Sequence, residues 1–257
     1  MKNLIERHQY ILKKLQEEGS VSVQELSTEI QVSHVTIRKD LKLLEDKNLL
    51  FRTHGGGSSS NPYAQEKPVA EKELLHAEAK KLIAVAAVKL IGNNDSIIIA
   101  SGTTMLALAR SIGLDQHLTV ITSALNVALA LSHHQYVDVL QLGGMLRKNS
   151  SSVAGHYAEP VLSEVMCSLL FLGVDGIDLE LGLTTTSLAE ARLNQKMMEA
   201  AELTVILADS SKIGKRGLGK ICSLDRVQYL ITDDGISQSA TEVLENKGIK
   251  VTVVKRF

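Results

Sequence analysis

The stretch VSHVTIRKDL, residues 32–41, separates apolar from polar side chains in a way that decides the fold of the N-terminal part of the chain. At helical spacing, Ile37 and Leu41 fall on one face, whereas the hydroxyl-bearing and basic side chains fall on others. Ser33 stands just before this pattern, where a serine hydroxyl accepts a hydrogen bond from the first turn of a helix. The stretch therefore predicts an amphipathic helix that begins after Ser33.

Two further helices are predicted upstream of this one. Apolar residues recur at helical spacing from Leu4 to Leu15 and stop before Gly19, which is a common helix terminator. Ser22 and Glu25 have the spacing of a capping box, and this predicts that a second helix begins there. Only residues 31–32 separate the second helix from the third. Two short helices joined by so tight a turn are typical of a helix-turn-helix.

The polar face of the third helix predicts contact with DNA. The second helix of such a motif enters the major groove, where arginine binds guanine and small hydroxyls reach bases or phosphates. Residues 49–57, LLFRTHGGG, predict a strand or hairpin that adds a wing beside the DNA backbone. A solvated amphipathic helix without DNA is the alternative. The predicted DNA-binding residues are Ser22, Ser33, His34, Thr36, Arg38, Lys39, Lys42, Arg52 and His54.

The composition changes after the glycines of the wing. Residues 55–68, GGGSSSNPYAQEKP, are poor in apolar side chains and rich in glycine and serine, as flexible linkers are. A structural loop is the alternative. We therefore predict a winged helix-turn-helix domain over residues 1–57, a linker over 58–69 and a second domain over 70–257.

The second domain reads as an α/β fold. A long amphipathic helix is predicted over 70–91, and short apolar runs then alternate with helical stretches. Such alternation is typical of a mostly parallel sheet with helices on both faces. The predicted strands are 96–100, 118–122, 137–142, 169–174, 204–208, 229–232 and 250–254. The predicted helices that follow are 124–133, 188–201 and 237–246.

Polar residues collect after these strands, where ligands of parallel sheets bind. The turn SGTT at 101–104 opens a helix, and its backbone N–H groups and hydroxyls would form an anion cradle. Several such turns with cationic and carboxylate side chains predict a small polyhydroxylated anion such as a sugar phosphate. Simple helix capping at these turns is the alternative. The predicted effector-binding residues are Ser101, Gly102, Thr103, Thr104, Ser123, Gly143, Gly144, Arg147, Ser152, Asp175, Gly176, Thr184, Glu190 and Lys212.

Motifs along nearly the whole chain resemble those of the DeoR family of bacterial transcription regulators. In the first domain these are VS at 32–33, TIR at 36–38, DL at 40–41, LE at 44–45 and RTHGG at 52–56. In the second they are SGTT at 101–104, GGMLR at 143–147, FLGVDGID at 171–178 and DSSKIG at 209–214. The resemblance implies a phosphosugar sensor domain similar in fold to ribose-5-phosphate isomerase. Residues 170–180 and 190–194 resemble the amino-sugar, galactosamine-type branch of the family.

Catalysis is the main alternative to a sensor. Asp175 and Asp178 resemble the carboxylates of the isomerases, which shuttle protons. The isomerases also carry a turn of the Lys-Gly-Gly-Gly type, whereas this chain has Glu180-Leu181-Gly182-Leu183-Thr184. Without that lysine, the group expected to stabilise an enediolate is missing. We therefore predict no catalytic residues, no metal and no cofactor.

The bulk composition sets the class of protein. The chain has 257 residues, of which 44% are hydrophobic, and no apolar run approaches the roughly 18 residues of a membrane span. Its first residues, MKNLIERHQY, lack the apolar segment of a secretion signal. Two cysteines exclude a disulfide scaffold and fit a reducing cytoplasm. We expect a cytoplasmic protein that does not partner with a membrane.

These observations lead to one hypothesis with open alternatives. The chain is predicted to be a homo-oligomeric repressor, dimer or tetramer, that binds operator DNA and is released by a phosphorylated sugar or amino sugar. The effector must prefer the DNA-incompetent arrangement, since equal affinity for both would shift nothing. Activation in place of repression, an isomerase-like enzyme, and a DNA-binding adaptor without a small ligand are the alternatives.

Overall fold

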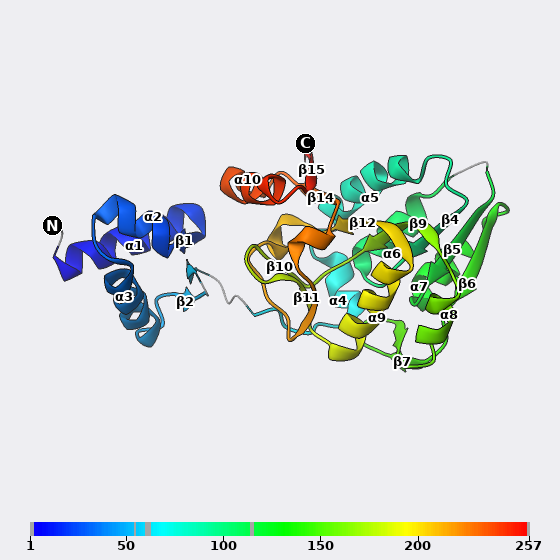
Figure 1. Ribbon diagram of the computed structural model, residues 1–257, viewed down its shortest axis with the longest axis horizontal. Coiled ribbons are helices and arrows are strands. Elements are labelled where there is room, and N and C mark those ends of the chain that lie inside the picture. Colours follow the sequence, from blue (N-terminus) through cyan, green and yellow to red (C-terminus); the bar gives the residue numbers. More distant parts are fainter. Residues whose placement is uncertain (1–2, 54, 60–62, 114–115, 256–257) are drawn as a thin grey trace. The chain divides into compact units, whose positions relative to one another are not determined.

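The chain divides into two units, Met1–Tyr63 and Ala64–Phe257, which are drawn in Figure 1 and considered separately here. This computed structural model describes residues 3–53, 55–59, 63–113 and 116–255. Within those residues, no helix combines the length and the apolar composition that crossing a lipid bilayer requires.

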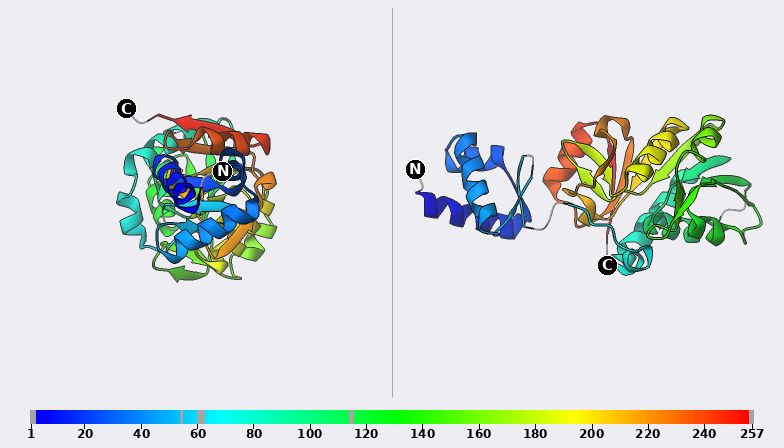
Figure 2. Two further views of the ribbon diagram at one scale, coloured as in Figure 1. Left: turned by 90° about the vertical axis from the view of Figure 1, so that its left-hand side faces the viewer. Right: turned by 90° about the horizontal axis from the view of Figure 1, so that it is seen from below.

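In the described part of the first unit, which can be followed in Figure 2, there are three helices and three short strands. Helix α2 leads into α3 through Gln31, whose φ of 58° turns the chain sharply. Apolar side chains of the three helices, including Ile11, Leu26, Ile37 and Leu41, form one core. The predicted helix-turn-helix is therefore the observed fold. The elements are α1 (Leu4–Glu18), β1 (Ser20–Ser22), α2 (Val23–Ile30), α3 (His34–Asp46), β2 (Phe51–Arg52) and β3 (Gly56–Ser58).

The helix ends of this unit follow the predicted signals, with one difference. Gly19 ends α1 with a φ of 75°, a left-handed conformation that glycine adopts without strain. The Ser22 hydroxyl caps α2 by accepting from the Gln24 and Glu25 N–H groups. The predicted return bond from the Glu25 side chain is not among the capping bonds of α2, so the capping-box prediction was half right. The complete box lies at α1, where Asn3 and Glu6 cap each other.

The three strands form an antiparallel sheet in the order β1-β3-β2. Glycine is needed at position 56 because a Cβ there would lie 1.7 Å from the Val21 carbonyl oxygen. Ser58 pairs with Ser20 and therefore belongs to this sheet, although the sequence-based linker began at that residue.

Seven parallel strands form the main sheet of the second unit, in the order β15-β14-β12-β9-β4-β5-β6. All seven predicted strands are found here, within a few residues at each end. The parallel α/β prediction is confirmed. The strands are β4 (Ser96–Ile99), β5 (Leu118–Thr122), β6 (Val137–Gln141), β9 (Cys167–Leu172), β12 (Ala201–Leu207), β14 (Tyr229–Asp233) and β15 (Lys250–Val254).

The two faces of this sheet carry separate hydrophobic cores, so the strands are apolar on both sides. One core joins Ile97, Ile99 and Phe171 to the helices α5 (Ala77–Ile91), α6 (Thr103–Ser111) and α7 (Leu125–Leu131). The other core joins Ile98 and Leu170 to α8 (Glu159–Ser163), α9 (Leu188–Glu199) and α10 (Gln238–Asn246). The sheet therefore lies between two helical layers.

Small elements at the sheet edge were not predicted. A hairpin joins β7 to β8, and a second small sheet has the order β10-β11-β13. The single helix predicted over 70–91 was wrong in one respect, because His76 adopts a φ of 52° and splits it into α4 and α5. The additional elements are α4 (Val69–Leu74), β7 (Met145–Arg147), β8 (Ser152–Ala154), β10 (Gly176–Asp178), β11 (Gly182–Thr185), β13 (Gly219–Cys222) and the 3₁₀ turns η1 (Ser210–Lys212) and η2 (Leu224–Arg226).

Candidate functional site

Helix α3 presents a polar surface opposite its buried face. Ile37, Leu41 and Leu44 are buried in the core of the first unit. Thr36 is half-buried, while the predicted DNA-contact residues Ser33, His34, Arg38, Lys39 and Lys42 are exposed. The helix therefore carries three basic side chains in its first nine residues that no core contact immobilises.

An ion pair fixes α3 on α1. Asp40 is 2% exposed, and its carboxylate accepts from Arg7 Nε at 2.7 Å and Arg7 Nη2 at 3.0 Å. His8 Nε2 lies 3.3 Å from the same carboxylate. The hydrogen bond to Asp40 raises the pKa of the Arg7 guanidinium. The position of the exposed face of α3 thus depends on an ion pair whose carboxylate is buried.

Three of the predicted DNA-contact residues, Ser22, Ser33 and Arg52, also make hydrogen bonds within the first unit. The Ser33 hydroxyl caps α3 by accepting the Thr36 N–H at 3.2 Å. Ser22 caps α2, as described above. The wing residue Arg52 is exposed, and its N–H donates to the Glu45 carboxylate at 2.9 Å, which joins β2 to α3. His54 lies outside the described residues.

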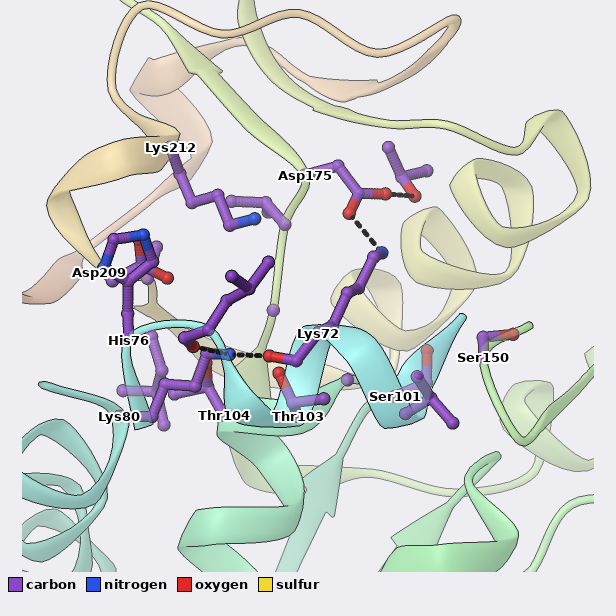
Figure 3. A pocket seen from close by; sticks show the side chains of 18 of the residues that line it. Lys72, His76, Lys80, Ser101, Thr103, Thr104, Ser150, Asp175, Asp209 and Lys212 are labelled. Atoms are coloured by element: carbon purple, nitrogen blue, oxygen red, sulfur yellow. Dashed lines mark hydrogen bonds and ion pairs between the residues drawn. The ribbon is translucent and has the colours of Figure 1, made fainter. Parts of the chain in front are cut away.

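A cavity of about 130 Å³ lies in the second unit beyond the carboxyl ends of β4, β9 and β12, which are neighbours in the sheet (Figure 3). Ligands of parallel sheets bind at this position. Helices α4 and α5 complete the wall. The predicted effector residues that line the cavity are Ser101, Gly102, Thr103, Thr104, Asp175, Glu190 and Lys212.

The other seven predicted effector residues do not line the cavity, and their role in binding stays a prediction. Arg147 and Ser152 stand behind Glu190, whose carboxylate lies 2.9 Å from Arg147 Nη1 and 3.2 Å from the Ser152 hydroxyl. The Thr184 hydroxyl accepts from the Gly217 N–H at 2.8 Å, within the small sheet. The residues outside the cavity wall are Ser123, Gly143, Gly144, Arg147, Ser152, Gly176 and Thr184.

Cationic side chains and the start of a helix line the cavity. Helix α6 begins there, and Gly102 supplies no capping side chain to its first turn. The positive end of the helix dipole, together with Lys80 and Lys212, favours an anion. Lys80 is only 5% exposed, and burial lowers its pKa to about 8, although Asp209 acts in the opposite direction. Its ammonium donates to the carbonyls of Lys72 and of Leu75, the latter at 2.6 Å.

Carboxylates also line the cavity. Lys72 Nζ lies 2.8 Å from Asp175 Oδ1, and the other oxygen accepts from the Thr185 hydroxyl at 2.9 Å and the Thr186 N–H at 3.0 Å (Figure 3). Burial by itself would raise the pKa of Asp175, but Lys72 and these hydrogen bonds lower it to about 2. Glu190 lies beside it and accepts from Thr185 at 3.3 Å. A ligand with an anionic group and several donor groups matches this polarity.

Sequence reasoning missed three basic residues of the cavity: Lys72, His76 and Lys80. All three lie within the predicted helix over 70–91, for which only the apolar pattern was interpreted. A signal was present for Lys80, because it stands at helical spacing with the buried Ile83, Ala84 and Ala87. A lysine in a buried stripe is rare unless its charge has a partner or a function.

No group of three or more His, Cys, Asp or Glu side chains suited to a metal ion occurs among the residues described.

Comparison with known proteins places both units in one family. A model of the DeoR-like helix-turn-helix domain matches residues 7–62, and a model of the DeoR C-terminal sensor domain matches residues 75–234. A "Putative aga operon transcriptional repressor" of Escherichia coli O157:H7 is 39% identical over 97% of this chain and 93% of its own. A "Lactose phosphotransferase system repressor" of Staphylococcus epidermidis is 33% identical over 90% of this chain and 93% of its own.

Solved structures resemble this chain only at low similarity, with TM-scores of 0.39 and 0.40 for two of them. Ribose 5-phosphate isomerase A from Neisseria gonorrhoeae superposes on 52% of this chain and 52% of its own, with 18% identity and a TM-score of 0.39.

Proposed function

Since the chain belongs to the DeoR family, we propose that it is a transcriptional repressor whose α3 helix binds operator DNA and whose second unit binds a phosphorylated sugar that releases the DNA. The observation that carries this proposal is the presence of both halves in one chain. One unit exposes Arg38, Lys39 and Lys42 on a recognition helix, and the other holds a cavity lined by both cationic and acidic side chains.

The polarity of the cavity indicates how a sugar phosphate would lie in it. Its phosphate group would bind at the start of α6, between Lys80 and Lys212. Its hydroxyl groups would then donate to Asp175 and Glu190. An ammonium group would suit the same carboxylates, and this supports an amino sugar phosphate as one member of the ligand class. The name of the E. coli relative, an aga operon repressor, supports repression as the direction of control.

Oligomerisation belongs to the same proposal. Helix-turn-helix proteins of this kind bind repeated half-sites as two-fold symmetric dimers, because two recognition helices match two turns of the major groove. We propose that the second unit forms that dimer, or a tetramer built from it.

Catalysis receives less support from the geometry. Asp178 accepts from the Glu180 N–H at 2.9 Å and the Leu181 N–H at 2.8 Å, and it pairs with Arg216. Its carboxylate is therefore occupied and does not line the cavity, so the two carboxylates that resemble those of the isomerases, Asp175 and Asp178, do not face the cavity together. This arrangement supports binding of a sugar phosphate without proton transfer.

The DNA-binding half is tested by a salt titration. The full chain should bind a fragment from upstream of its own gene, and the logarithm of its affinity should fall linearly with the logarithm of the salt concentration. A fragment of the same composition in shuffled order should bind at least about a thousandfold more weakly. Equal affinity for both fragments would contradict operator recognition, whereas conversion of ribose 5-phosphate by the protein alone would favour the enzyme.

A further inference from the structure

The segment Ala64–His76, here called the strap, connects the sequence of the first unit to helix α5 and contributes to the wall of the cavity. It includes α4, none of whose side chains is buried. The Ala64 N–H donates to the Arg216 carbonyl at 2.6 Å. An element without buried apolar side chains is held mainly by its polar contacts, and these decide whether it stays docked.

Several polar contacts of the strap go to charged groups in and behind the cavity wall, while Glu73 pairs with Arg110 of α6 outside the cavity. Lys72 pairs with Asp175 at 2.8 Å. Glu66 lies 2.5 Å from Arg147, which also binds Glu190. Lys80 donates to two strap carbonyls that the break between α4 and α5 leaves available, those of Lys72 and Leu75. The strap therefore contacts groups that line the cavity or stand behind its wall.

The bond between Lys72 and Asp175 is the one that a ligand is best placed to replace. Asp175 keeps its orientation without Lys72, because Thr185 and Thr186 hold its other oxygen. Lys72 belongs to a short helix and is 26% exposed, so water can solvate its ammonium once it leaves. A ligand ammonium in place of Lys72 keeps both the hydrogen bond and the charge pairing at Asp175, whereas a ligand hydroxyl keeps the hydrogen bond alone.

We infer that the strap reports occupancy of the cavity to the DNA-binding unit, and that Lys72 is the residue a ligand displaces. A hydroxyl or ammonium group of the ligand takes the place of Lys72 at Asp175, the strap leaves the cavity wall, and the chain that leads to the first unit loses its attachment. The docked strap is the DNA-competent state. This inference rests on the proposed function, since it names the element that couples the two units.

The test compares K72M with K67M in the full chain. Lys67 is on the same strap but pairs with the exposed Glu71, so its substitution removes the same charge without touching the cavity. K72M should speed hydrogen exchange of the peptide 64–76 and weaken operator binding about tenfold in the absence of ligand, a usual size for coupling between sites. K67M should match the wild type, and K72R, which retains a partner for Asp175, should restore both properties.

Ligand probes separate this inference from the proposed function. Glucosamine 6-phosphate, galactosamine 6-phosphate, fructose 6-phosphate and inorganic phosphate would be added to each variant. Release of operator by a probe from the wild type and from K72M alike, with unchanged exchange in 64–76, would overturn the strap and leave the phosphosugar sensor intact. Weak operator binding by K72M, with no probe active on the wild type, would support the strap and reject these ligands. Tighter operator binding by K72M would overturn the inference.

Discussion

Arg7 of α1 and Asp40 of α3 form a two-point ion pair across the first unit, with N–O distances of 2.7 and 3.0 Å. The Asp40 carboxylate is buried. Because the pair joins α1 to α3, it fixes the position of the exposed face of α3. Loss of one partner leaves a buried charge, which costs more than loss of an exposed pair.

We expect R7M to lower the free energy of unfolding of the first unit by about 3 kcal/mol. Hydrogen exchange of α3 peptides in the full chain would measure this. K13M is the matched control, since Lys13 pairs with Glu17 on the exposed side of the same helix and its removal should cost at most about 0.5 kcal/mol. Equal protection of α3 in the two variants would contradict a stabilising role for the Arg7–Asp40 pair.

Arg38 is exposed on α3 and is the residue we expect to read a base. R38A should weaken operator binding about tenfold or more and leave binding of sugar phosphates unchanged. K13A removes an exposed charge from α1 and should have little effect. Fluorescence anisotropy with operator and with shuffled DNA would measure both variants. Operator affinity that survives R38A would mean that another surface recognises the DNA.

Buried Lys80 predicts a pH dependence of stability. Its pKa is about 8 in the folded chain and 10.5 when unperturbed, so the unfolded chain binds more protons between these values. The free energy of unfolding therefore rises with pH across this window. The K80M variant lacks this gain. From pH 7 to pH 10.5, the free energy of unfolding of the wild type should therefore rise by about 3 kcal/mol relative to that of K80M.

Urea unfolding of the wild type and of K80M at several pH values would measure that difference, because the contributions of the other titrating groups cancel in the comparison. Parallel curves for wild type and K80M would show that Lys80 keeps its ordinary pKa.

Lys212 lines the cavity, and we expect it to contact the phosphate group. K212A should weaken binding of an active sugar phosphate about tenfold and leave operator affinity unchanged. K220A, which removes an exposed lysine of β13 outside the cavity, is the control. Calorimetric titration would measure the affinities. If K212A and K220A bind the ligand equally, the phosphate lies elsewhere.

The main sheet was predictable because its signal is local. Runs such as Ile97–Ile99 are buried on both faces, and each of the seven runs is a strand. The helix-turn-helix was predictable for the same reason, since Ser22, Ser33 and Gly19 mark helix ends through bonds to near neighbours.

The cavity wall was harder to predict because it depends on contacts far apart in sequence. Lys72 and Asp175 are separated by 103 positions, and nothing local indicates that they meet. The break at His76 has no proline or glycine to signal it; Lys80 bonds to the carbonyls around it. Ser123 follows a strand as predicted, whereas Thr184 lies in β11, which was not predicted; both are buried, and neither lines the cavity.

Release of DNA by a sugar phosphate is the central claim, and anisotropy of labelled DNA from upstream of the gene measures it most directly. The full chain would be titrated at fixed salt until the DNA is bound, and hexose, pentose and amino-sugar phosphates would then be added singly. We predict that one of them lowers the anisotropy to that of free DNA, whereas its unphosphorylated sugar does not. Tight, specific binding that no phosphorylated sugar reverses would contradict a phosphosugar-controlled repressor.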